Sequence, residues 1–150
     1  MNGKLPHPFP YQGSKRNIAP KILKFFPEKI ERLIEPFAGS AAISIASAYH
    51  GLSKHFIIND LNKPLVDLLR MIVEHPIEIA NLYEKLWNEQ LDNPRKFYDN
   101  IREQFNLTGK PEYFLYLLPV KTTDEVSGGV WGRRPHTFGE TTLLLSYIGL

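Results

Sequence analysis

Residues 33–42 read L-I-E-P-F-A-G-S-A-A, an apolar run that ends in an acid and a proline and leads into small residues. The run predicts a short strand over 32–35, and the alanine- and isoleucine-rich stretch after it predicts a buried helix over 40–49. Gly39 lies in the loop between them, where the missing side chain lets a ligand approach the backbone. This combination is typical of a binding loop at the end of a strand.

A second strand is predicted over 55–59, where H-F-I-I-N forms a continuous apolar run. Such runs are found in parallel sheets that are covered on both faces. A strand, a helix and a second strand make a βαβ unit, which implies a parallel pair of strands. The sequence therefore belongs to the α/β class. Because two strands are too few for a full sheet, it represents the opening part of a larger α/β fold.

Helices are predicted for most of the remaining sequence up to about residue 118. The first covers 14–26, with Ser14 as its N-cap, and a later one follows the second strand, with Asn62 as its cap and Pro64 near its first turn. Apolar residues recur at helical spacing throughout. The expected buried stripes are Ile18, Ile22, Phe25 and Phe26; Leu65, Leu68, Leu69, Ile72 and Val73; Ile79, Leu82, Tyr83, Leu86 and Trp87; Phe97, Ile101 and Phe105; and Phe114, Leu117 and Leu118.

Both predicted strands end in an acid, Glu35 on the first and Asp60 on the second. Ligands of α/β sheets bind beyond the carboxyl ends of the strands, and an acid about 20 residues after the glycine loop accepts hydrogen bonds from ribose hydroxyls. Asp60 follows Gly39 by 21 residues. A carboxylate suits a diol because it only accepts hydrogen bonds and offers two oxygens. The alternatives are structural: Glu35-Pro36 as a simple strand exit, and Asp60 as the cap of the next helix.

The loop F-A-G-S-A-A-I contains one glycine and lacks the G-x-G-x-x-G pattern of dinucleotide-binding proteins. A pyrophosphate needs several close backbone approaches, which more glycines would provide. A nucleoside ligand without phosphate, such as S-adenosylmethionine, does not. The loop therefore favours an adenosyl-methionine-like ligand, and a dinucleotide-binding half-domain is the less favoured alternative.

The composition is that of an ordinary globular protein, with 43% hydrophobic and 23% charged residues and a net charge of +2. The absence of cysteine excludes disulfides and cysteine-based zinc sites. The five histidines show no metal-ligand spacing, so no metal site is predicted. The N-terminus has no signal-peptide pattern, and no apolar run approaches the roughly 20 residues of a membrane helix. We expect a cytoplasmic protein that does not enter a membrane.

Three segments in order carry a family resemblance: P-Y-Q-G-S-K at 10–15, E-P-F-A-G-S at 35–40 and N-D-L-N at 59–62. Together they resemble the N-terminal portion of the Dam-type (D12 class) adenine-N6-specific DNA methyltransferases, and the resemblance covers about 1–118. It implies an incomplete Rossmann-like S-adenosylmethionine-dependent methyltransferase fold, a βαβ core with helices. It also implies S-adenosyl-L-methionine as the cofactor and double-stranded DNA as the partner.

The resemblance assigns the cofactor to eight residues: Tyr11, Lys15, Glu35, Phe37, Gly39, Ser40, Asp60 and Leu61. In the first loop, Glu35 would face the methionine amino group, and the residues through Ser40 would wrap the methionine part. In the second, Asp60 would hold the ribose hydroxyls and Leu61 would flank the adenine ring. Near the N-terminus, Tyr11 would pack against the cofactor, and Lys15 would contact it or hold its loop.

The catalytic motif of this family, Asp-Pro-Pro-Tyr, is absent from the 150 residues, as are its N-P-P-Y and S-P-P-Y variants. We therefore predict no catalytic residue and expect an N-terminal fragment that is inactive alone. A second polypeptide or a longer gene product would have to supply the motif. The alternative is a non-catalytic remnant or adenosyl-binding module.

Three parts are expected along the chain. Residues 1–62 form the cofactor-binding part, 63–118 a helical segment leading toward the DNA-recognition region, and 119–150 a divergent tail. The tail is rich in glycine and threonine and loses the resemblance abruptly, which suggests a shifted or truncated reading frame.

Overall fold

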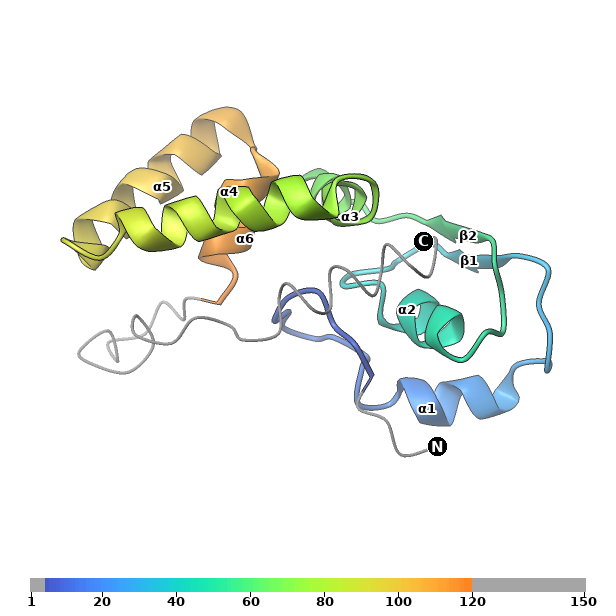
Figure 1. The fold of residues 1–150 in the computed structure, drawn as a ribbon. Coiled ribbons are helices and arrows are strands. Elements are labelled where there is room, and N and C mark those ends of the chain that lie inside the picture. The colour runs from blue at the N-terminus through green and yellow to red at the C-terminus, as the bar shows by residue number, and fades with distance from the viewer. Residues whose placement is uncertain (1–4, 120–150) are drawn as a thin grey trace.

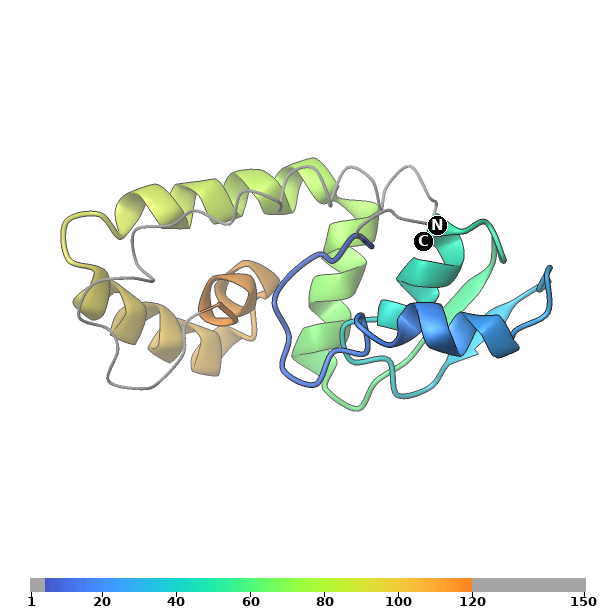
Figure 2. The same ribbon diagram turned by 90° about the horizontal axis from the view of Figure 1, so that it is seen from below.

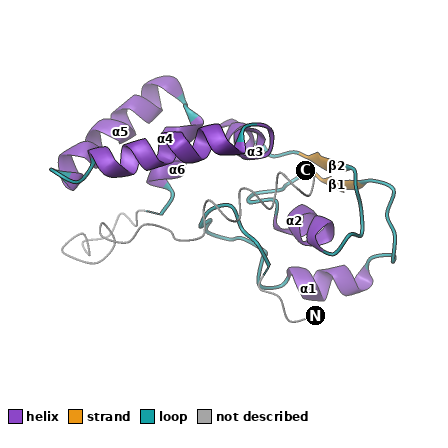
Figure 3. Cartoon of the chain, in the orientation of Figure 1, coloured by secondary structure: helices purple, strands orange, loops and turns teal. Residues whose placement is uncertain are grey.

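A computed structural model describes residues 5–119 of the chain (Figure 1). Its elements, in chain order, are helix α1 (Ala19–Ile22), the 3-10 helix η1 (Leu23–Phe25), strand β1 (Leu33–Glu35), helix α2 (Ala42–Tyr49), strand β2 (Phe56–Ile58), and helices α3 (Lys63–Glu74), α4 (Pro76–Glu89), α5 (Pro94–Thr108) and α6 (Pro111–Leu117). The strands, α1 and α2 form one end of the molecule, and helices α3 to α6 form the other (Figure 3). The predicted tail from residue 120 onward lies outside the described residues.

β1 and β2 pair in parallel, with Leu33 opposite Phe56 and Glu35 opposite Ile58. The predicted strand–helix–strand unit is thus confirmed, with each strand slightly shorter than expected. The chain turns into α2 between the two strands, and α2 packs against β1. The parallel pairing brings the carboxyl ends of both strands to the same edge of the sheet.

One face of this sheet is open among the described residues, contrary to the expectation of a sheet covered on both faces. The Glu35 side chain accepts a hydrogen bond from the Ser44 hydroxyl of α2, so α2 covers the face of β1 to which Glu35 points. Successive strand residues point to opposite faces. Ile34 therefore points away from α2, and Ile34 and its cross-strand partner Ile57 remain 54% and 45% exposed.

The predicted first helix is wrong in its start and in its stripe. α1 begins only at Ala19, its N-cap Ile18 provides no side-chain hydrogen bond, and Pro20 lies in the first turn. Ser14, the expected cap, instead shares a hydrogen bond of 2.8 Å with the hydroxyl of Ser40. Ala19 is buried, whereas Ile18 is 45% exposed and Phe25 is 89% exposed. A short helix followed by a 3-10 turn breaks the 3.6-residue spacing on which the stripe was based.

Helices α3 to α6 form a bundle in which α6 packs against α3, α4 and α5 (Figure 2). The predicted stripes of α3 and α4 supply most of its core, namely Leu65, Leu68, Leu69, Ile72, Ile79, Tyr83 and Leu86. In α6 the most buried residues are Leu115 and Tyr116, and the predicted Phe114, Leu117 and Leu118 are half-buried against the same core. The same core includes Ala38 and Ala41 of the glycine loop. The bundle therefore supports that loop directly.

A polar pair lies inside this bundle. The hydroxyl of Tyr116 donates a hydrogen bond of 2.8 Å to Oε1 of Gln90, and both residues are at most 2% exposed. Burial raises the pKa of the Tyr116 hydroxyl well above its usual range. The pair fixes α6 against the end of α4.

Candidate functional site

Two loops meet at the carboxyl edge of the sheet, residues 35–41 after β1 and residues 59–62 after β2, and we call them together the cradle. Backbone hydrogen bonds join them: the Asn59 N–H donates to the Glu35 carbonyl at 3.0 Å, and the Ala38 N–H donates to the Asn59 carbonyl at 3.0 Å. The Asn59 side-chain amide also donates to the carbonyl of Pro36 at 3.2 Å. The two loops therefore form one connected unit.

Asp60 holds the centre of the cradle through its carboxylate. One oxygen accepts the Gly39 N–H at 2.8 Å, and the other accepts the Asn62 N–H at 2.9 Å. These backbone donors, Asn62 first and then Gly39, lower the pKa of Asp60 because they stabilise its charged form. An ionised carboxylate offers about four lone-pair positions. Asp60 thus keeps acceptor capacity for a ligand while it fixes both loops.

Glu35 connects β1 to the first turn of α2. Its Oε2 accepts the Ser44 N–H at 2.9 Å and the Ser44 hydroxyl at 2.6 Å. A carboxylate is stabilised at this end of a helix, where backbone N–H groups are otherwise unpaired. Among the described residues, both hydrogen bonds to the Glu35 side chain end on Oε2, and Oε1 is left to accept a further donor.

The glycine loop has an unusual backbone. Gly39 has φ +53° and Ala41, the N-cap of α2, has φ +54°. Glycine adopts this left-handed region without cost, whereas alanine pays about 1 kcal/mol or more. The Tyr11 ring packs over Gly39, with its Cε1 3.4 Å from where a Cβ would stand. The glycine therefore serves the backbone turn and the contact with Tyr11.

The eight predicted cofactor residues fall into two groups. Tyr11, Glu35, Gly39, Ser40 and Asp60 are brought together by the contacts of the cradle, and Ser40 is buried against Ser14. The side chains of Lys15, Phe37 and Leu61 do not join these contacts. Their side chains are exposed, Phe37 to 89% and Leu61 to 97%.

Three polar side chains support the cradle, and the sequence did not predict that role for any of them. Ser44 holds Glu35, and the side chain of Asn59 holds Pro36. Ser14 is predicted to cap a helix, but its hydroxyl joins the segment before α1 to the glycine loop. The spacing of Ser44 in the first turn after the loop is the one local signal that could have indicated such a role, because N–H groups there seek acceptors.

Two further observations concern the described residues as a set. Residues 5–119 contain no group of three His, Asp or Glu side chains placed to hold a metal ion. None of the helices in this part of the chain is long and apolar enough to cross a membrane.

Comparison of the sequence with models of known protein families gives a match. The sequence model for D12 class N6 adenine-specific DNA methyltransferases matches residues 11–120, which include the whole cradle and the helical bundle. The chain belongs to this family. The resemblance noted from the three sequence segments is thereby confirmed.

Three proteins of similar sequence are named as a methyltransferase or as DNA adenine methylases. The chain is 32% identical over 92 residues to the type II methyltransferase M1.LlaDCHI of Lactococcus lactis subsp. cremoris, covering 61% of the chain and 30% of that protein. It is 31% identical over 113 residues to the retron Ec67 DNA adenine methylase of Escherichia coli, covering 71% and 37%. It is 30% identical over 123 residues to the DNA adenine methylase of Haemophilus influenzae, covering 78% and 42%. The chain thus spans about a third of the length of these relatives.

Proposed function

We propose that this chain is the S-adenosylmethionine-binding part of a DNA adenine-N6 methyltransferase. Its parallel strand pair with α2 would be part of a Rossmann-like sheet, residues 1–62 would hold the cofactor, and 63–118 would lead toward the DNA-recognition region. S-adenosylmethionine, when bound, supplies a methyl group on a positively charged sulfur. Membership of the D12 class supports this assignment.

The observation that carries the proposal is the Asp60 carboxylate at the carboxyl end of β2. An aspartate is ionised at neutral pH, and the backbone hydrogen bonds to Asp60 lower its pKa further. Hydrogen bonds of 2.8 and 2.9 Å from Gly39 and Asn62 fix its orientation, so it is preorganised to accept from two neighbouring hydroxyls. A ribose diol is the ligand group that such an acceptor suits.

The cradle favours an adenosyl ligand over a dinucleotide. A pyrophosphate binds through free backbone N–H groups at the N-terminus of a helix. Here the Gly39 N–H is taken by Asp60 and the Ser44 N–H by Glu35. Two carboxylates therefore occupy the donors that a phosphate would need, and their negative charge repels it.

The remaining predicted residues have chemistry that fits the other parts of the cofactor. Oε1 of Glu35 is available for the methionine ammonium group. Phe37 and Leu61 present exposed apolar side chains on the two loops, where an adenine ring and the methionine chain would cover them. The Tyr11 ring packs against Gly39. Lys15 is close to Tyr11 in the sequence and carries an exposed positive charge.

We further propose that this chain does not transfer the methyl group to double-stranded DNA by itself. The 150 residues lack the D-P-P-Y motif that holds the target amino group in the family. A second polypeptide, or a longer product of the gene, would supply it. The same absence favours one alternative, an adenosyl-binding module without catalytic activity. A methylation assay with a separately produced D-P-P-Y half from a D12-class relative distinguishes the two: activity only on mixing supports the enzyme.

The binding claim is tested by isothermal titration of the full chain with S-adenosylmethionine, S-adenosylhomocysteine and NAD. We expect both adenosyl ligands to bind and NAD not to bind. Binding of NAD alone would overturn the proposal, and so would the absence of heat with all three ligands in a chain that circular dichroism shows to be folded.

A further inference from the structure

The face of the sheet that points away from α2 carries an apolar patch. Ile34 of β1 and Ile57 of β2 are paired across the strands, so both side chains point to this face and lie next to each other. They are 54% and 45% exposed. Parallel sheets are normally covered on both faces. An occupant of this patch would therefore bury apolar surface that the described residues leave in water.

A hollow of about 480 Å³ adjoins the patch at the amino end of the strands. Its lining residues are Glu31, Arg32, Ile34 and His55. Ile34 belongs to both the patch and the hollow, so the two are continuous. We call Ile34, Ile57 and the hollow together the open face.

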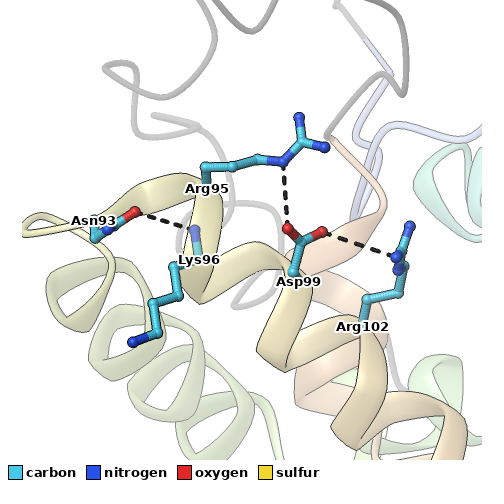
Figure 4. A network of polar contacts seen from close by, with 5 residues as sticks. All are labelled: Asn93, Arg95, Lys96, Asp99 and Arg102. Atoms are coloured by element: carbon cyan, nitrogen blue, oxygen red, sulfur yellow. Dashed lines mark hydrogen bonds and ion pairs between the residues drawn. The ribbon is translucent and has the colours of Figure 1, made fainter.

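Arg32 brings a positive charge to the open face. Its side chain is exposed, and none of the ion pairs within residues 5–119 includes it, although Glu31 lines the same hollow. The arginines of α5 differ in this respect, because Arg95 and Arg102 lie 3.3 and 3.8 Å from the carboxylate of Asp99 (Figure 4). The open face therefore suits an occupant that has apolar side chains with an acid next to them.

The sequence beyond the described residues contains a segment with this chemistry. Residues 141–150 read T-T-L-L-L-S-Y-I-G-L, with six large apolar side chains and no charge, and Glu140 comes directly before them. The segment also lies beyond residues 11–120, which match the D12 class.

The chain is long enough to bring this segment to the open face. The 21 residues from 120 to 140 can span up to about 70 Å when extended. A folded domain of this size has a radius of gyration of only about 13 Å. Every part of the described structure is therefore within reach of residues 141–150.

We propose that residues 141–150 bind the open face of the same chain, with their apolar side chains on Ile34 and Ile57 and with Glu140 beside Arg32. Burial of apolar surface drives the contact, and the ion pair sets the direction in which the segment lies. Tethering gives the segment a local concentration on the order of millimolar, so a weak contact is sufficient. The inference is independent of the proposed function, because it involves neither the cradle nor a ligand.

The test is paramagnetic broadening in methyl NMR spectra of the full chain. The chain has no cysteine, so S146C accepts a single nitroxide label within the proposed segment. The methyl signals of Ile34 and Ile57 should lose most of their intensity relative to the same sample with a reduced label. Ile77 is a matched control, because it is also an exposed isoleucine, at 66%, but lies on α4. Its signal should keep most of its intensity.

A charge in the centre of the open face should release the segment. Ile34 is already half exposed, so I34D leaves the core of the chain intact and should restore the Ile57 signal. I77D places the same charge on α4 and should leave the Ile57 signal broadened.

Charge reversal tests the ion pair separately. R32E and E140R should each lower the ratio of bound to free segment by about two- to fivefold, as the Ile57 signal reports. The double variant R32E/E140R should restore the wild-type ratio. R95E is the control, since it reverses an exposed arginine that already lies beside Asp99, and it should leave the ratio unchanged.

Three results would overturn the proposal. The first is equal broadening of Ile34, Ile57 and Ile77, or broadening of none of them. The second is broadening of Ile34 and Ile57 when nitroxide-labelled chains are mixed with isotope-enriched chains that carry no label, because a second copy would then be the occupant. The third is a double variant R32E/E140R that binds the segment no better than either single variant, which would contradict the placement of Glu140 beside Arg32.

Discussion

Phe37 provides a test of the cradle that is separate from protein stability. Its side chain is 89% exposed, so replacing it with alanine removes almost no packing from the folded chain. We expect F37A to change the free energy of unfolding by less than about 0.5 kcal/mol. If the adenosyl ligand lies against Phe37, however, the substitution removes apolar surface that binding would bury.

The size of the binding effect follows from that exposure. Full burial of a phenylalanine side chain is worth about 1.5–3 kcal/mol. A ligand that covers about half of the exposed ring therefore gains about 1 kcal/mol, which corresponds to roughly fivefold in Kd. The loss in F37A should be close to that value.

The assay is isothermal titration with S-adenosylhomocysteine, together with thermal unfolding of the same samples. Phe25 is a matched control because it is also a phenylalanine, is also 89% exposed, and lies in η1 outside the cradle. F25A should bind the ligand with wild-type affinity. Wild-type affinity in F37A, or an equal loss in F25A, would refute the placement of the ligand against Phe37.

Three further predictions concern stability. The lowered pKa of Asp60 means that its stabilisation is present above the unfolded value of 3.8 and is lost as the pH falls through the folded pKa; acid titration should show the advantage of wild type over D60N constant above about pH 5 and shrinking below 3.8. G39A should cost about 1 kcal/mol in urea unfolding, because φ +53° strains alanine while its Cβ meets Tyr11 at an ordinary contact distance; an unchanged midpoint would contradict the left-handed backbone. Y116F should cost about 1–3 kcal/mol by leaving Oε1 of Gln90 unpaired, and Q90L in the same chain should recover most of that loss; an additive double variant would show that the pair does not interact.

Local patterns were sufficient for the elements whose burial is set by near neighbours in sequence. The strand pair, α2 and the stripes of α3 and α4 follow from apolar spacing alone, and Leu65, Leu68 and Ile72 are fully buried as that spacing predicts. The acid at the end of each strand was also visible in the sequence. Parallel pairing then brings the loops that carry Glu35 and Asp60 to the same edge.

The predictions from sequence failed where contacts between residues far apart in the chain determine the structure. Ser14 has the chemistry of a helix cap, but its hydroxyl pairs with Ser40, 26 residues away. In α6, contacts with three other helices decide which residues are most buried, so Tyr116 is more deeply buried than Phe114. The groove between the segment before α1 and helices α5 and α6 could not be predicted for the same reason, because Gln12 and Arg102 line it together only through the tertiary fold.

The contact between Asp60 and the ribose is the central claim, and a comparison of ligands tests it most directly. S-adenosylhomocysteine and an analogue lacking both ribose hydroxyls are titrated into the wild-type chain and into D60A. Two hydrogen bonds to a charged acceptor, each worth about 1.5–3 kcal/mol, should make the wild type prefer the complete ligand by roughly a hundredfold or more. D60A should bind the two ligands with similar affinity. A wild-type chain that does not distinguish the ligands, or a D60A chain that keeps the full preference, would contradict the account.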